Sequence, residues 1–210
     1  MESFQTDPMV ILLSIIGIIP AHVLTLLMAW LVVTKFNKFS FREVLGWRSG
    51  GFAWWYYPIV LGGFFIVAAF VNYFLPEQEN ELIRILRSSR TVVYFVAFMA
   101  TFTAPIVEEV IYRGILYSAV QRSLGIGWAI FIVTALFAGV HFYQYWGSPG
   151  TIILIVLLSL ILTLIRVRTN NLLPCIILHT IFNGIQSLSL IFFQDLAIDK
   201  PQNAFFQLFK

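Results

Sequence analysis

Long uncharged stretches alternate with short polar segments along the chain. Six stretches lack Asp, Glu, Lys and Arg: Val10–Val33, Trp54–Phe74, Thr91–Val107, Trp128–Trp146, Thr151–Ile165 and Leu172–Phe193. A helix needs about 20 apolar residues to cross a bilayer core, and lipid cannot satisfy the open edges of strands. The pattern therefore predicts an all-α fold, a polytopic transmembrane helical bundle of about six spans, in a single integral membrane domain over residues 1–210.

The segments between the spans carry turn and interface signals. Gly147–Gly150 and Thr169–Asn171 predict tight turns at the two ends of the fifth span. That span is short, so we expect it to extend through Arg166, whose side chain would reach out to the interface. Residues 77–90 mix Leu and Ile with Glu and Arg, which predicts a segment lying flat on the membrane interface.

The composition excludes a soluble protein. Hydrophobic residues make up 60% of the chain and charged residues 11%, whereas soluble proteins carry about 25% charged residues. The net charge is only +3, and the basic residues lie between the apolar stretches rather than in one patch. This distribution indicates topology signals and contacts with membrane lipids, and it argues against a nucleic-acid partner.

The termini and loops give an expected orientation. Residues 1–7 lack the basic region of a signal peptide, so the first stretch is interpreted as a retained span. With the N-terminus outside, the inner loops hold eight Lys and Arg residues and the outer side holds five. Because basic residues favour the inner face, this count favours the N-terminus-outside orientation.

The third span ends in two adjacent carboxylates, followed by an arginine. Glu109 and Arg113 are four residues apart and are expected to pair along one helix face, whereas Glu108 points about 100° round the helix. Ionisable groups inside spans are costly and are usually functional. A carboxylate held away from water is suited to act as a general base near neutral pH. The alternative is an interfacial Glu–Arg helix cap without a catalytic role.

The fourth span contributes Phe137 and His141, four residues apart. A lone histidine near the interface is more often a packing residue than a catalyst. Tyr143, Tyr145 and Trp146 follow it, and we interpret these three aromatic residues as part of an interfacial belt.

The sixth span contains His179 and Asn183, which share one helix face. Taken singly, this pair could simply join two helices by hydrogen bonds. Taken together, Glu108, His141, His179 and Asn183 supply a base, an orienting imidazole and donors for an oxyanion. Those are the groups needed for amide hydrolysis by an activated water molecule.

Two other chemistries use some of the same residues. Imidazole and carboxylate groups also suit zinc, although the sequence has no His-Glu-x-x-His and Asn is an unusual zinc ligand. Cys175, the only cysteine, excludes an internal disulfide and a multi-cysteine zinc site. It lies four residues before His179, which suggests a Cys–His dyad, but a buried cysteine usually behaves as a small hydrophobe. His22 and Asn72 have no identifiable partner and are interpreted as structural.

The motifs resemble a known family. Glu108-Glu109-x-x-x-Arg113, Phe137-x-x-x-His141 and His179-x-x-x-Asn183 occur in this order on successive predicted spans. They resemble the three motifs of the CAAX-protease and bacteriocin-processing enzyme family, which includes the type II CAAX prenyl endopeptidases. The resemblance covers a motif-bearing core over residues 92–187.

The resemblance implies an intramembrane glutamate endopeptidase without a metal or other cofactor. It implies that Glu108 and His141 activate the attacking water and that His179 and Asn183 stabilise the oxyanion. Glu109, Arg113 and Phe137 would support them. The substrate would be a peptide or protein at the membrane, lipidated or not, and the short chain resembles bacterial members, which reside in the cytoplasmic membrane. A zinc-dependent protease and a non-catalytic adaptor or bacteriocin self-immunity protein remain as alternatives.

Overall fold

The computed structural model is helical throughout its regular elements. It describes residues 8–48, 50–78, 83, 86 and 89–199. The α-helices are α2 (Pro8–Leu31), α3 (Phe41–Leu45), α4 (Tyr56–Phe74), α6 (Arg90–Phe98), α7 (Ala104–Glu109), α8 (Tyr117–Leu124), α9 (Ile126–Phe142), α10 (Pro149–Thr169) and α11 (Leu173–Asp199). Three π-helical segments join them: η1 (Val32–Phe36), η2 (Met99–Thr103) and η3 (Val110–Leu116).

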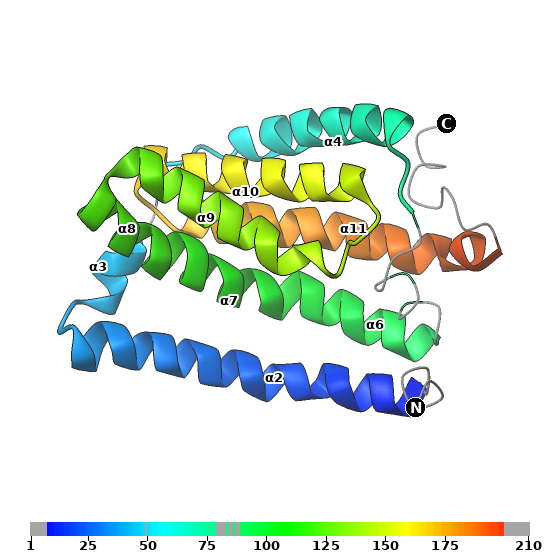
Figure 1. Cartoon of the computed structure of the whole chain (residues 1–210), viewed down its shortest axis with the longest axis horizontal. Coiled ribbons are helices and arrows are strands. Elements are labelled where there is room, and N and C mark those ends of the chain that lie inside the picture. The colour runs from blue at the N-terminus through cyan, green and yellow to red at the C-terminus, as the bar shows by residue number, and fades with distance from the viewer. Residues whose placement is uncertain (1–7, 49, 79–82, 84–85, 87–88, 200–210) are drawn as a thin grey trace.

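The predicted polytopic bundle is confirmed. Five helical stretches are long and apolar enough to cross a membrane, and α9 is a shorter apolar helix. Figure 1 shows α2 along one side of the long helix formed by α6 to α8, with α4 and α10 on the other side. Helix α11 packs against α6, η2, α7 and α10. The protein is therefore an integral membrane helical bundle.

The third predicted span is longer in the structure than its apolar run. The helix continues from Arg90 to Leu124, so the motif carboxylates lie in its middle and not at its end. The sequence rule ends a span at charged residues because lipid cannot solvate them. Here the charged side chains find partners inside the protein. The fourth helix, by contrast, stops at Phe142, and residues 143–147 form a turn.

The two turns predicted around the fifth span are present. Gly147 has φ +86° just before α10 begins, and Asn170 has φ +46° just after it ends. Gln78 donates its backbone N–H to Ser148 Oγ over 3.2 Å, and the Ser148 hydroxyl donates back to the Gln78 carbonyl over 3.1 Å. These reciprocal bonds fasten the chain after α4 to the start of α10. The rest of the predicted interfacial segment, residues 79–90, falls largely outside the described residues.

The prediction that the Arg166 side chain reaches the interface is wrong. Its side chain is only 2% exposed, and its guanidinium donates from Nε to the Arg113 carbonyl over 3.0 Å and from Nη2 to the Val44 carbonyl over 3.1 Å. Nη1 donates to Asn170 Oδ1 over 2.7 Å. An arginine can stay buried when its donors are satisfied in this way. The helix does extend through Arg166, as expected.

The loop that carries α3 is seated on the bundle by backbone and side-chain contacts. Asn171 Nδ2 donates to the carbonyls of Arg48 and Gly50, over 2.9 and 2.8 Å. Ser118 Oγ donates to the Val44 carbonyl over 2.9 Å. Helix α3 ends at Leu45 and is capped by Gly46, whose φ of +61° favours glycine. Residues 41–48 and 50, here called the α3 loop, are therefore held against the bundle, with Val44, Leu45 and Gly46 buried.

We expect Gly46→Ala to destabilise the protein clearly. A Cβ atom at this position would overlap the carbonyl oxygen of Asn170, and a left-handed backbone alone costs a non-glycine residue about 1–2 kcal/mol. Gly50→Ala is the matched control, because Gly50 also has a positive φ but has open space around it. Thermal unfolding in detergent should show a lower midpoint for Gly46→Ala than for Gly50→Ala. Equal midpoints would mean that the close approach to Asn170 is unimportant.

Candidate active site

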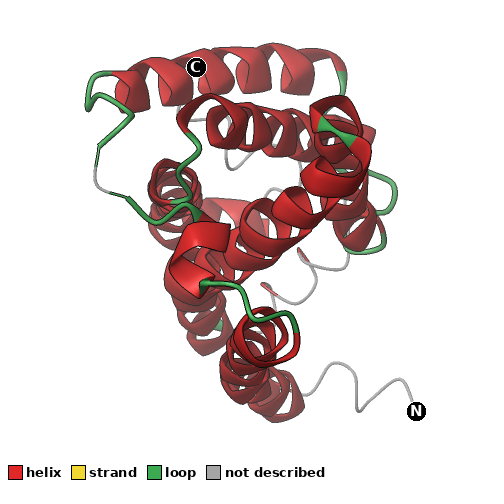
Figure 2. Cartoon of the chain, turned by 90° about the vertical axis from the view of Figure 1, so that its left-hand side faces the viewer, coloured by secondary structure: helices red, strands yellow, loops and turns green. Residues whose placement is uncertain are grey.

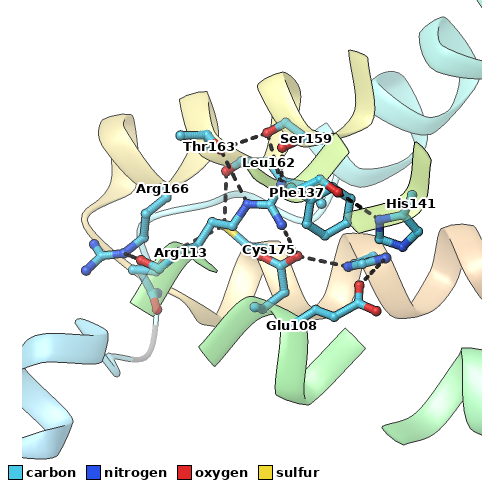
Figure 3. Close-up of polar contacts among 12 residues, drawn as sticks. Glu108, Arg113, Phe137, His141, Ser159, Leu162, Thr163, Arg166 and Cys175 are labelled. Atoms are coloured by element: carbon cyan, nitrogen blue, oxygen red, sulfur yellow. Dashed lines mark hydrogen bonds and ion pairs between the residues drawn. The ribbon is translucent and has the colours of Figure 1, made fainter. Parts of the chain in front are cut away.

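Glu109 and Arg113 form the buried centre of the site. Arg113 Nη1 lies 2.8 Å from Glu109 Oε1, and both side chains are fully buried, which confirms the predicted pairing. Arg113 Nη2 donates to Ser159 Oγ over 2.8 Å, and Nε donates to Thr163 Oγ1 over 3.3 Å. Figure 3 shows the Arg113 guanidinium between α10 and Phe137. Helix α10 therefore supplies the polar groups that allow a charge to stay inside the bundle.

Glu109 also orients one of the motif histidines. Its Oε1 atom lies 2.8 Å from His179 Nδ1. An ionised carboxylate only accepts hydrogen bonds, so His179 donates through Nδ1–H to a Glu109 that is paired with Arg113. This fixes which ring nitrogen remains for chemistry: Nε2 faces away from Glu109.

Glu108 has a different environment from its neighbour. Its Oε2 atom lies 3.8 Å from His179 Nε2, and its side chain is 26% exposed. As expected from its position on the helix, it does not share the Arg113 partner of Glu109. The two adjacent glutamates thus differ: Glu109 is enclosed and bonded through Oε1 to Arg113 and His179, and Glu108 is the more accessible carboxylate.

Phe137 packs against the groups that make up the site. Its ring lies 4.4 Å from the Arg113 guanidinium carbon, and its centroid lies 4.8 Å from the His141 ring and 6.0 Å from the His179 ring. Its carbonyl oxygen lies 2.8 Å from His141 Nδ1. A carbonyl only accepts, so His141 donates from Nδ1, and the neutral form of this ring has its lone pair on Nε2. Figure 3 shows His141 beyond Phe137, on the side away from Arg166.

Asn183 lies one turn beyond His179 and is bound to the backbone. Its Nδ2 donates to the Ala100 carbonyl over 2.8 Å. Ala100 belongs to η2, where the N–H of Ala104 bonds to Met99 five residues back. The next donor in this register would be Pro105, which has no N–H. Asn183 therefore supplies the hydrogen bond that the proline leaves missing, and the second N–H of its amide remains unassigned.

The other polar span residues have partners that the sequence did not identify. His22 Nδ1 lies 3.0 Å from Thr103 Oγ1 in η2, and Asn72 Nδ2 donates to the Ala68 carbonyl over 2.8 Å. Cys175 is fully buried, and its thiol donates to the Leu162 carbonyl over 3.3 Å. His179 Nδ1 is directed to Glu109 and not to Cys175.

Tyr145, which the sequence analysis grouped with the interfacial belt, is a neighbour of the site. Tyr143 and Trp146 are 81% and 66% exposed, as expected for an interfacial belt, but Tyr145 is partly buried. Its N–H donates to the His141 carbonyl over 3.2 Å, so the two residues lie one helical turn apart. Burial raises the pKa of the Tyr145 phenol, and the negative charges of Glu77 and Glu108 raise it further. The four-residue spacing between His141 and Tyr145 could have indicated that Tyr145 lies near the site.

The structure thus gathers Glu108, Glu109, Arg113, Phe137, His141 and His179 around one buried cluster, with Asn183 beside it. The sequence missed the α10 residues Ser159 and Thr163, because serine and threonine in a hydrophobic run carry no distinctive signal.

Comparison with known proteins identifies the segment that bears this cluster. Residues 90–185 match the family model described as type II CAAX prenyl endopeptidase Rce1-like. That range contains all seven motif residues. No curated protein and no solved structure gives a significant match to the chain. The match spans just under half of the chain, and this segment with its motif cluster is therefore similar to the type II CAAX prenyl endopeptidases.

Proposed function

We propose that the protein is a metal-independent intramembrane endopeptidase that attacks a peptide bond with a water molecule activated by Glu108 and His141. The observation that supports this most directly is the division between the two glutamates. Glu109 is enclosed by Arg113 and His179, whereas Glu108 is partly exposed and has only a long contact to His179. A carboxylate free to accept a proton is what a general base requires.

The proton transfers follow from the ring nitrogens that remain available. Water gives a proton to Glu108, assisted by the lone pair on His141 Nε2, and its oxygen attacks the scissile carbonyl carbon. The carbonyl oxygen becomes an oxyanion. When the oxyanion collapses to a carboxyl group, the C–N bond breaks and the base gives its proton to the leaving amine. No covalent bond to the enzyme forms, and one water molecule is consumed.

The oxyanion would be stabilised by donors from α11. His179 donates from Nε2 when its ring is protonated, and the carboxylate of Glu109 balances that positive charge through Nδ1. Asn183 uses one amide N–H for Ala100 and has a second for the substrate. Arg113 and Phe137 hold Glu109 and the imidazole rings in place. These are the roles that the family resemblance implies for these residues.

The proposed substrate is a membrane-associated peptide or protein, prenylated or unmodified, that reaches the site between apolar helices. The proposed location is the cytoplasmic membrane of a bacterium. Lipids are the only other partners proposed, and no role with nucleic acid is proposed.

The deciding experiment is cleavage of quenched fluorescent peptides by purified protein in lipid nanodiscs. The panel should contain prenylated and unprenylated peptides of the same sequence, so that the lipid requirement is read directly. We expect turnover that depends on Glu108. Turnover of no peptide would contradict the proposal and favour the adaptor or immunity function.

We expect the activity to survive treatment with a strong chelator, and the purified protein to contain no stoichiometric zinc by elemental analysis. Within the described residues, no three His, Cys, Asp or Glu side chains converge as metal ligands would. Both motif histidines also use Nδ1 to bond protein acceptors. Loss of activity on chelation, with recovery on adding zinc, would instead establish the zinc-dependent alternative.

A further inference from the structure

Exposed cations gather at one end of the bundle. This basic rim consists of Lys35, Lys38, Arg42, Arg48, Arg122 and Arg168, all of them exposed. The elements that carry them lie at the end bearing α3 and α8 in Figure 1, which faces the viewer in Figure 2. Among the described residues of this end, the only carboxylate is Glu43, and none of the six cations forms an ion pair. The rim therefore presents six positive charges against one carboxylate.

Large aromatic side chains accompany the basic rim. Phe36 is 78% exposed, Trp54 76% and Trp55 50%. Trp47 is 42% exposed, and its carbonyl accepts a hydrogen bond from Arg42 Nε over 3.3 Å. The Arg122 guanidinium lies 4.9 Å above the Phe39 ring. Aromatic residues of this kind occupy the headgroup level of a membrane, so the cations beside them lie where lipid phosphates lie.

The basic rim is hydrogen-bonded to the catalytic cluster through the α3 loop. The Val44 carbonyl of that loop accepts from Arg166 Nη2, and Arg166 Nε donates to the Arg113 carbonyl, over 3.1 and 3.0 Å. The Arg113 side chain then binds Glu109 over 2.8 Å. Glu109 in turn binds His179. If the α3 loop moved away, a donor of the buried Arg166 would lose its acceptor, which is costly.

We propose that the basic rim binds the headgroups of anionic phospholipids, and that this binding supports catalysis by holding the α3 loop against Arg166. A ligand that binds only the docked loop increases the population of the docked state. Phosphate headgroups fit the charge of the rim, and their acyl chains fit the exposed aromatic side chains. Lipid binding by the basic rim does not depend on the proposed protease activity. The proposed effect of that binding on catalysis does rest on the proposed protease activity.

The binding half is tested with spin-labelled lipids. Full-length protein is reconstituted in phosphatidylcholine, and the fraction of immobilised label is compared for phosphatidylglycerol and phosphatidylcholine. We expect the wild type to prefer phosphatidylglycerol. Each cation near a membrane surface contributes about fivefold in affinity, so the triple variant K38Q/R42Q/R48Q should lose most of the preference. The control K38R/R42K/R48K keeps the charge and should keep it. Equal preference in the wild type and the glutamine variant would overturn the proposal.

The catalytic half is tested in nanodiscs with and without phosphatidylglycerol. Turnover by the wild type should rise severalfold with the anionic lipid, and turnover by the glutamine variant should not. If the wild type prefers phosphatidylglycerol but its turnover does not change with that lipid, the link between lipid binding and catalysis is overturned, and lipid binding itself is not. If the wild type cleaves nothing in any lipid, the proposed function fails separately. Hydrogen exchange then decides the coupling: phosphatidylglycerol should slow exchange in the α3 loop of the wild type, and unchanged exchange would overturn it.

Discussion

Glu108→Gln is expected to reduce peptide cleavage by about 10²- to 10⁴-fold, the contribution of a general base, while leaving the protein folded. Glutamine keeps the shape of the side chain but cannot accept the proton of the attacking water. The side chain is 26% exposed, and its ion-pair distance to His179 is long, at 3.8 Å, so the fold should lose little stability when glutamine keeps the same shape. Turnover of the fluorescent peptides and thermal unfolding in the same detergent would measure both effects.

The neighbouring glutamate provides the matched control. Glu109→Gln is the same chemical change one residue away, in a side chain that is fully buried between Arg113 and His179. It should lower the unfolding midpoint clearly, because a buried positive charge loses its partner. The contrast between the two variants separates a catalytic carboxylate from a structural one. Full activity in Glu108→Gln would contradict the proposed mechanism.

Arg113→Met should give the largest loss of stability of any single change at the site, about 3–5 kcal/mol. Methionine fills a similar volume but leaves the buried Glu109 without its cation and Ser159 without its donor. Glu109 would keep only its bond to His179, because its Oε2 atom has no hydrogen-bond partner among the described residues. The expected result is a protein that unfolds at much lower temperature or fails to insert stably, measured by thermal unfolding and by yield of monodisperse protein.

Double substitution tests whether the loss comes from the unpaired charge. In Glu109→Leu/Arg113→Met, both charges are removed together, and buried ion pairs replaced by apolar residues are often tolerated. This variant should recover much of the stability that Arg113→Met loses but none of the activity, because His179 no longer has an acceptor for Nδ1. Equal stability of the single and double variants would show that packing, and not charge, explains the effect of Arg113.

Hydropathy predicted the spans well because lipid imposes its requirement on each segment separately. It failed where a polar side chain has partners on another helix. The third helix continues past Glu109 and Arg113 because α10 and α11 satisfy those residues, and Arg166 is buried because carbonyls of the α3 loop and η3 accept its donors. Such partners are distant in the sequence, so no local window contains them.

Within the site, the sequence predicted the pairing of Glu109 with Arg113 because both residues lie on one helix. It could not predict that Glu109 would also bind His179, since that contact depends on how α7 packs against α11. The π-helical register of η2 and the bond from Asn183 to Ala100 were equally inaccessible, although Pro105 marks the place where a backbone partner is missing. The catalytic roles of Glu108, His141, His179 and Asn183 stay predictions until activity is measured.

The hydrogen bonds that hold the α3 loop on the bundle affect how this protein could be truncated or joined to a relative in a chimera. The family match begins at residue 90, yet the carbonyls of Val44, Arg48 and Gly50 accept hydrogen bonds from Arg166 and Asn171 inside the matched segment. Residues 90–185 are thus not a self-contained module. A chimera between relatives should exchange the α3 loop together with the end of α10. The buried donors of Arg166 and Asn171 then keep the backbone carbonyls that accept their hydrogen bonds.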